Sequence, residues 1–219
     1  MMHDASSTEQ ELAAGWPLSR VEACLVRAEK IQLIALLRLR YTERFFEPIR
    51  SLRGARGHSK GFGFAIMSLC SLLVENLQCY RLGLPTTHNG EYPLLARLAP
   101  PPEYDIPRAE RRNGRQVFLE FFAFAPNQQL FPGVNGETYY SFIRNGLLHQ
   151  AQTKDGWRIK IRQAHLWNDQ SKVVDRDKFA DALSRAFSFY LAELTNARWD
   201  DDLWRKARRK IWWIIKLSE

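Results

Sequence analysis

The sequence has little cysteine, and its three cysteines, Cys24, Cys70 and Cys79, do not have the CxxC spacing of zinc sites. An odd cysteine count without that spacing argues against both a disulfide framework and a structural metal. All three lie in apolar stretches with helical patterns, so we interpret them as small buried side chains in a reducing compartment. The P-loop, the HExxH motif and the nucleophile-elbow serine are also missing, so no metal site or cofactor is expected.

Long apolar segments are missing as well. The longest apolar run, residues 62–74, contains serine and glycine and is shorter than the roughly 20 residues of a bilayer span, so no stable membrane insertion is expected. Residues 1–15 have neither the basic start nor the apolar core of a secretion signal. We interpret them as a flexible polar tail before one domain over residues 16–219, and we expect a cytoplasmic protein.

The composition is that of a globular domain with a basic surplus. Of the 219 residues, 45% are hydrophobic and 26% are charged, which is ordinary for a chain that buries a core. The 32 basic residues exceed the 24 acidic ones and give a formal charge of +8. This surplus favours polyanionic partners, chiefly nucleic acid or an anionic membrane surface.

Helical spacing of apolar residues dominates the first half of the chain. The pattern begins at Ser19 and continues until Pro48 interrupts it, and one kinked helix or two consecutive helices fit it equally well. Residues 62–82 predict a strongly apolar helix that ends at Gly83. The aromatic run at 116–124 predicts a short helix or, less well, a strand.

The second half predicts the helix 137–152, hereafter the motif helix, followed by two short strands in a hairpin within residues 155–167. Asp175 or Asp177 caps the next helix, and an amphipathic basic helix begins near residues 200–202. The predicted fold class is therefore all-α or mainly α: a helical bundle with a small β-hairpin after the motif helix and an amphipathic helix at the C-terminus.

The polar face of the motif helix carries Arg144, Asn145 and His149 rather than the Lys/Glu mixture of a solvated helix. Asn145 and His149 are four residues apart and can touch. Arg144 and His149 are five apart and diverge by about 140° on an ideal helix. They can converge only because arginine is long, or because a partner surface completes the site.

The spacing R-N-x-x-x-H of Arg144, Asn145 and His149 on a late helix of a bundle resembles the motif of the HEPN superfamily. Many members of that superfamily are metal-independent endoribonucleases, and many belong to prokaryotic toxin–antitoxin or antiphage systems. The resemblance implies a homodimer in which two motif helices form one composite site, with RNA as substrate and an antitoxin or regulatory protein as a further partner. It also implies a supporting polar residue on an earlier helix, for which Glu75 or Asn76 is the best positional match. Ser141, on the polar face of the motif helix, is a further supporting candidate.

The chemistry of these residue types fits RNA cleavage. Histidine is the residue type suited to acid–base chemistry near neutral pH, so His149 can act as base or acid, while Arg144 offers a permanent cation to phosphate oxygens. Asn145 can orient the imidazole or bind a phosphate oxygen. Two alternatives remain open: a catalytically silent protein that binds RNA or a nucleotide at the same place, and a helical interaction or regulatory subunit that uses Trp212 and Trp213.

Two basic clusters are candidate RNA-binding surfaces. The first lies between two predicted helices and holds Arg50, Arg53, Arg56 and Lys60, together with His58. The second holds Arg111, Arg112 and Arg115 after Arg108. Each cluster either tracks an RNA backbone towards the motif helix or is an ordinary solvated surface.

Overall fold

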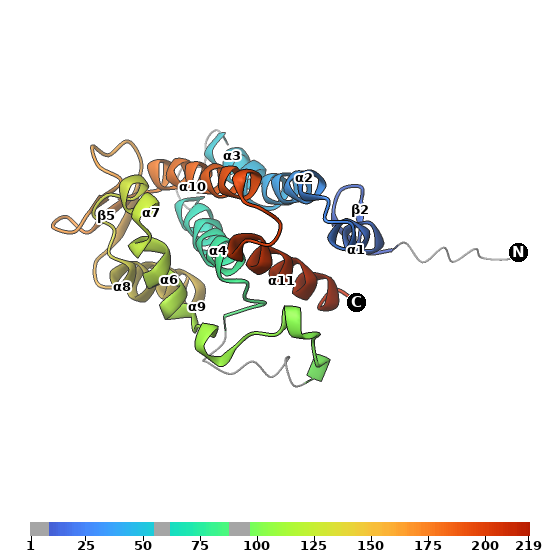
Figure 1. The fold of residues 1–219 in the computed structure, drawn as a ribbon. Coiled ribbons are helices and arrows are strands. Elements are labelled where there is room, and N and C mark those ends of the chain that lie inside the picture. Colours follow the sequence, from blue (N-terminus) through green and yellow to red (C-terminus); the bar gives the residue numbers. More distant parts are fainter. Residues whose placement is uncertain (1–8, 55–61, 88–96) are drawn as a thin grey trace, which may run out of the picture.

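The computed structural model describes residues 9–54, 62–87 and 97–219, which form a mainly helical fold, as the sequence predicts (Figure 1). The longer helices pack into one bundle around a shared apolar core. They are α1 (Leu18–Val26), α2 (Lys30–Tyr41), α3 (Glu47–Gly54), α4 (Phe62–Leu82), α6 (Gly114–Ala123), α7 (Ala125–Leu130), α10 (Arg176–Asn196) and α11 (Asp202–Lys216). Two short 3₁₀ turns, η2 (Pro102–Tyr104) and η3 (Arg108–Glu110), lie between α4 and α6.

Helix α4 lies in the middle of the bundle and packs against α10, α6 and α11 (Figure 1). Its predicted bounds, 62–82, are confirmed. Gly83 ends the helix because its φ of +69° is a left-handed conformation that glycine adopts at little energetic cost. The N–H of Leu84 then donates to the carbonyl of Cys79 at 2.9 Å, which satisfies one of the last carbonyls of the helix.

By length and composition alone, α4 is able to cross a membrane, so the expectation that no segment reaches that length is wrong. It is the one such helix in the described part of the chain. Half of its most apolar window is buried inside the fold, against α6, α10 and α11. This is the packing of a core helix, and its apolar composition follows from burial on several sides.

The prediction that Pro48 interrupts the helical pattern is wrong. The chain stays helical from α2 to α3 through a π turn, η1 (Thr42–Phe46), in which the N–H of Glu47 donates to the carbonyl of Thr42, five residues earlier. Proline has no N–H and its ring crowds the carbonyl four residues earlier in an α-helix, and the wider turn relieves that conflict. The helical pattern does break earlier, at Ala28, whose φ of +56° separates α1 from α2.

The expectation of a polar tail up to residue 15 is wrong for its last part. Strand β1 (Glu11–Ala13) pairs antiparallel with β2 (Trp16–Pro17), and Leu12 and Ala13 are buried. The carbonyl of Leu12 accepts a hydrogen bond from the Arg40 side chain of α2. Burial of these two apolar side chains holds the segment on the bundle. The sequence does not indicate this burial because the neighbouring residues are polar.

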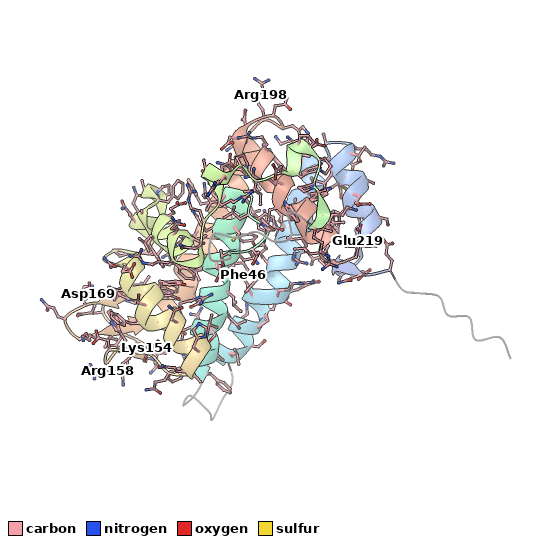
Figure 2. The ribbon with its side chains drawn as sticks, turned by 90° about the horizontal axis from the view of Figure 1, so that it is seen from below. Phe46, Lys154, Arg158, Asp169, Arg198 and Glu219 are labelled. Atoms are coloured by element: carbon pink, nitrogen blue, oxygen red, sulfur yellow. The ribbon has the colours of Figure 1, made fainter. Side chains whose placement is uncertain are left out.

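The predicted hairpin within residues 155–167 is also wrong. Strands β3 (Arg158–Lys160) and β4 (Trp167–Asn168) do not pair with each other but lie on either side of β5 (Val173–Asp175), parallel and antiparallel respectively. Asp175, the predicted cap, stabilises this arrangement because its carboxylate accepts from the N–H of Gln163 at 2.7 Å and from the first turn of α10. Figure 2 shows this appendage, with Arg158 and Asp169, at the end of the molecule opposite Glu219.

The C-terminal helix α11 begins near the predicted position and packs onto the bundle. Trp204 and Trp213 are fully buried, and Trp212 stacks on Tyr104 with ring centroids 5.0 Å apart. The apolar stripe of α11 therefore packs mainly on its own chain, and Trp212 stays partly exposed.

Candidate functional site

The motif helix consists of α8 (Gly136–Thr138), a π turn η4 (Tyr139–Arg144) and α9 (Asn145–Gln150). In the π turn the N–H of Asn145 donates to the carbonyl of Tyr140, five residues earlier. The predicted helix is confirmed as far as Gln150 and ends at Ala151, whose φ is +52°. π turns of this kind are often found at functional sites, and this one lies directly before Asn145.

Buried aromatic contacts fix the inner face of the motif helix. Tyr139 is fully buried, its ring stacks on Phe179 of α10 at 5.0 Å, and its hydroxyl lies 2.9 Å from the Ser71 hydroxyl of α4. Burial raises the pKa of Tyr139 well above its ordinary value, so this hydroxyl stays protonated. Ile143 and Leu147 continue the buried face. Because this face is fixed in the core, the orientation of the polar face is fixed as well.

Gly146 allows the chain after the motif helix to fold back against it. A Cβ atom at this position would overlap the carbonyl oxygen of Gln152 and would lie 3.1 Å from the Cα of Thr153. That returning segment is fixed by a hydrogen bond of 2.9 Å from the N–H of Lys154 to the carbonyl of Phe142. The absence of a side chain at Gly146 is therefore a requirement of packing.

Arg144 is held by an ion pair with α4. Its Nη2 lies 3.1 Å from Oε2 of Glu75, and the two side chains are 17% and 18% exposed. Its Nη1 donates to Oδ1 of Asn145 at 3.0 Å, and its guanidinium lies 5.5 Å from the ring centroid of Tyr140. Glu75, predicted to support the site, contacts Arg144 directly, so the central helix and the motif helix share one polar network.

Thr87, which the sequence analysis did not single out, completes this network. Its hydroxyl donates to the second carboxylate oxygen of Glu75, so both oxygens of Glu75 have a partner. A carboxylate fixed at both oxygens holds the guanidinium of Arg144 in one orientation. No signal in the sequence connects Thr87 with Glu75, since Thr87 lies in an irregular segment without periodicity.

Helix α11 anchors the segment that carries Thr87. Arg209, which is buried, donates from Nε to the carbonyl of Gly83 at 2.9 Å. Lys210 is also buried and donates from Nζ to the carbonyl of Pro85 at 2.7 Å, and burial lowers the pKa of this amine. Thr87 thus follows two residues that are fixed to the C-terminal helix.

Replacing Thr87 by valine should lower the free energy of unfolding by about 1 kcal/mol, because valine keeps the shape but leaves one oxygen of Glu75 without its donor. The expected loss of stability is small because Glu75 keeps its ion pair with Arg144 and stays partly exposed to solvent. Urea unfolding measures the difference, and Thr87→Ser, which keeps the hydroxyl, is the matched control. Equal stabilities of the valine variant and the parent would show that the hydroxyl does not stabilise the network.

Two other residues predicted to support the site, Asn76 and Ser141, form hydrogen bonds with other partners. Asn76 accepts a hydrogen bond from the Tyr41 hydroxyl at 2.7 Å, and Ser141 donates to Glu137 at 3.1 Å. In the described ranges neither forms a hydrogen bond with Arg144. Neighbouring residues on a helix point about 100° apart, so Glu75 and Asn76 cannot both face the motif helix.

His149 lies in the last turn of α9 and is exposed, and it has no hydrogen bond with any residue that the structure describes. Its neighbour Leu148 is 39% exposed. Arg144, in contrast, is directed towards Glu75 and is mostly buried. The structure does not join these two side chains by a direct contact within one chain, in line with the divergence expected from their spacing.

The predicted RNA-binding arginines are mostly engaged in ion pairs. Arg53 pairs with Asp181 at 2.7 Å and with Asp177 at 3.2 Å. Arg56 and Lys60, with His58, lie outside the described residues. Arg50 is exposed on α3. The first basic cluster therefore contains at least one arginine whose charge is balanced inside the protein.

The second basic cluster also contains arginines that form ion pairs. Arg112 pairs with Glu120, and Arg115 pairs with Glu137 at 2.6 Å. Arg111 donates from Nε to the carbonyl of Ile106 at 3.3 Å. The ion pairs of Arg112 and Arg115 reduce the charge that these two arginines offer to RNA, whereas the carbonyl bound by Arg111 is neutral.

No protein-family model, no curated protein and no solved structure matches this chain. Within the described ranges, no group of three or more His, Cys, Asp or Glu side chains is placed to hold a metal ion. The features that point to a function are the polar network of Glu75, Arg144 and Asn145, the exposed His149, and the resemblance of their spacing.

Proposed function

We propose that this chain is a metal-independent endoribonuclease of the HEPN type, with Arg144, Asn145 and His149 as its catalytic residues. The observation that carries the proposal is the network in which Glu75 holds Arg144 at 3.1 Å and Asn145 accepts from the same guanidinium at 3.0 Å. A fixed cation beside an amide, one helical turn before an exposed imidazole, is a set of groups that can cleave RNA without a metal.

In the proposed reaction the 2′-hydroxyl of a ribose attacks the adjacent phosphorus. A base removes the hydroxyl proton, the bond from phosphorus to the 5′-oxygen breaks, and an acid protonates that oxygen. His149 acts as the base or the acid. Arg144 stabilises the negative charge on the phosphate oxygens, and Glu75 is its positioning residue. The products are a 2′,3′-cyclic phosphate and a 5′-hydroxyl.

A homodimer, which the resemblance implies, accounts for the separation of the two side chains. Arg144 uses two of its five N–H groups on Glu75 and Asn145, and its Nε is buried without a partner, so the second hydrogens of Nη1 and Nη2 remain for a phosphate. His149 and the apolar Leu148 are exposed on the same helical turn. Two motif helices facing each other would cover Leu148 and bring the imidazole of one copy towards the guanidinium of the other. A toxin or antiphage effector restrained by an antitoxin is the corresponding biological role.

The direct test is cleavage of single-stranded RNA by the purified full chain in excess chelator, with the product ends identified. Arg144→Ala should lower the cleavage rate by about a hundredfold or more, because it removes the cation at the reacting phosphate. The matched control is Arg81→Ala, which breaks a comparable ion pair between α4 and Glu193 of α10, with side chains 16% and 28% exposed. The control should keep the parental rate within about threefold, since its effect is confined to stability.

The outcomes separate the proposal from its alternatives. An equal loss of rate in both variants would mean that Arg144 acts through stability, and absence of cleavage by the parent would exclude the ribonuclease proposal. RNA binding that weakens with salt, without cleavage, would identify the catalytically silent alternative.

A further inference from the structure

A cleft of about 450 Å³ lies at the β appendage, formed by α7, by the segment around β4, and by the first half of α10. None of its lining residues belongs to the motif helix. This volume is within the roughly 300–1,000 Å³ range of clefts that hold small ligands.

The polar side of the cleft is cationic. Arg185 of α10 and His165 are exposed and have no hydrogen bond or ion pair with any described residue. Lys178 donates from Nζ to the carbonyl of Ala164 at 2.7 Å, which uses one of its three donors and keeps the amine at the cleft wall.

One acidic residue, Asp181, also lines the cleft and forms an ion pair with an arginine from outside it. Its Oδ1 lies 2.7 Å from Nη1 of Arg53, and its Oδ2 accepts from Nη2 of the same guanidinium at 3.4 Å. Arg53 also lies 3.2 Å from Asp177, which in turn lies 3.6 Å from Nε of Arg176. Two arginines thus balance two aspartates, and the charges of Lys178 and Arg185 remain for a ligand. A cleft with this balance attracts an anion.

The lining of the cleft also includes apolar residues. These are Leu130 and Pro132, together with Leu166 and Trp167, which are 7% and 5% exposed. The indole of Trp167 is fixed by a hydrogen bond of 2.9 Å from Nε1 to Asp169 and by contact with Trp157, at 3.9 Å between centroids. A cleft lined by both apolar and cationic residues suits a ligand that has an organic ring as well as an anionic group.

We infer that this cleft binds the terminal phosphate of a nucleotide, with the phosphate on Arg185, Lys178 and His165 and the nucleoside against Leu130, Pro132 and Leu166. Arginine is suited to the phosphate because its planar fork donates two parallel hydrogen bonds. The nucleotide is either free or the 5′ end of an RNA chain, since both present the same group. This inference does not depend on the ribonuclease proposal, because the cleft uses none of the residues of the motif helix.

The test is isothermal titration of the full chain with adenosine 5′-monophosphate, inorganic phosphate, and a short RNA with either a 5′-phosphate or a 5′-hydroxyl. Arg185→Ala should weaken binding of the monophosphate by about tenfold, the usual effect of a lost charged hydrogen bond. Arg185→Lys, which keeps the charge but not the fork, should fall between that variant and the parent. The control is Arg38→Ala, which removes the same charge from an exposed position on α2 outside this cleft.

Binding of the monophosphate that Arg185→Ala weakens and Arg38→Ala does not would establish the site. Binding of the 5′-phosphorylated RNA but not of the monophosphate would support the site and identify RNA ends as the source of the phosphate. Equal binding of inorganic phosphate and the monophosphate would overturn the nucleotide assignment. Equal losses in Arg185→Ala and Arg38→Ala would overturn the site itself.

Discussion

Replacing His149 by alanine should lower the rate of RNA cleavage by about two to four orders of magnitude, the usual contribution of a general acid or base. Stability should change little, because His149 is exposed and forms no hydrogen bond with any described residue. The measurement is single-turnover cleavage of a fluorescent RNA, together with urea unfolding of the same preparation. A large loss of rate at unchanged stability would assign His149 to the chemistry and not to folding.

The matched control is His165→Ala, which removes an exposed imidazole from the cleft at the β appendage. The RNA substrate should have a 5′-hydroxyl. It then has no terminal phosphate that could bind in that cleft, and the two variants differ only in their effect on cleavage. Added imidazole should restore part of the activity of His149→Ala, which a purely structural role would not allow. If His149→Ala cleaves at the parental rate, the proposed role of this residue is wrong.

Replacing Gly146 by alanine should reduce the free energy of unfolding by about 2 kcal/mol, although alanine favours helices. The new Cβ would meet backbone atoms of Gln152 and Thr153, which cannot rotate away as the end of a side chain can. The hydrogen bond from Lys154 to Phe142 fixes that backbone, so the strain has to be taken up by the motif helix or by the returning chain. Chemical unfolding measures the loss, and the cleavage rate reports whether the catalytic groups are displaced.

Gly54→Ala is the matched control for this substitution. Gly54 is also helical, at the end of α3, and an added Cβ atom meets nothing within 4 Å. Its replacement should leave stability unchanged or raise it by up to about 1 kcal/mol, as helix propensity alone predicts. If Gly146→Ala behaved like this control, the close approach of residues 152–154 would not be a constraint.

The parts of the fold that were predictable from the sequence are those set by local rules. Gly83 ends α4 because a left-handed residue is needed there, and Asp175 caps α10 because a short carboxylate side chain reaches the free N–H groups of the first turn. The motif helix is predictable for a similar reason, since its apolar face has helical spacing. These features depend only on residues that are close in the sequence, so they can be predicted without knowing the tertiary structure.

The features that were missed depend on contacts between distant segments. β5 lies between β3 and β4, and the parallel pairing of β3 with β5 joins residues that a hairpin pattern cannot reveal. Thr87 meets Glu75 because α11 holds the segment before it, and that is a property of tertiary packing. Glu75 and Asn76 are neighbours on a helix, so only one of them can face the motif helix. Which one does so depends on the orientation of α4, which the sequence does not give.

The π turn before Asn145 determines the direction of the polar face of the motif helix. A turn of this kind contains one residue more than the α-helical turn that it replaces. If residues 139–144 formed a regular α-helix instead, with none removed, the following turn would be rotated by about 100° about the axis. Asn145 and His149 would then face another direction while Tyr139 kept its place on Phe179. The π turn therefore sets the direction in which the polar face points relative to the buried face of the motif helix.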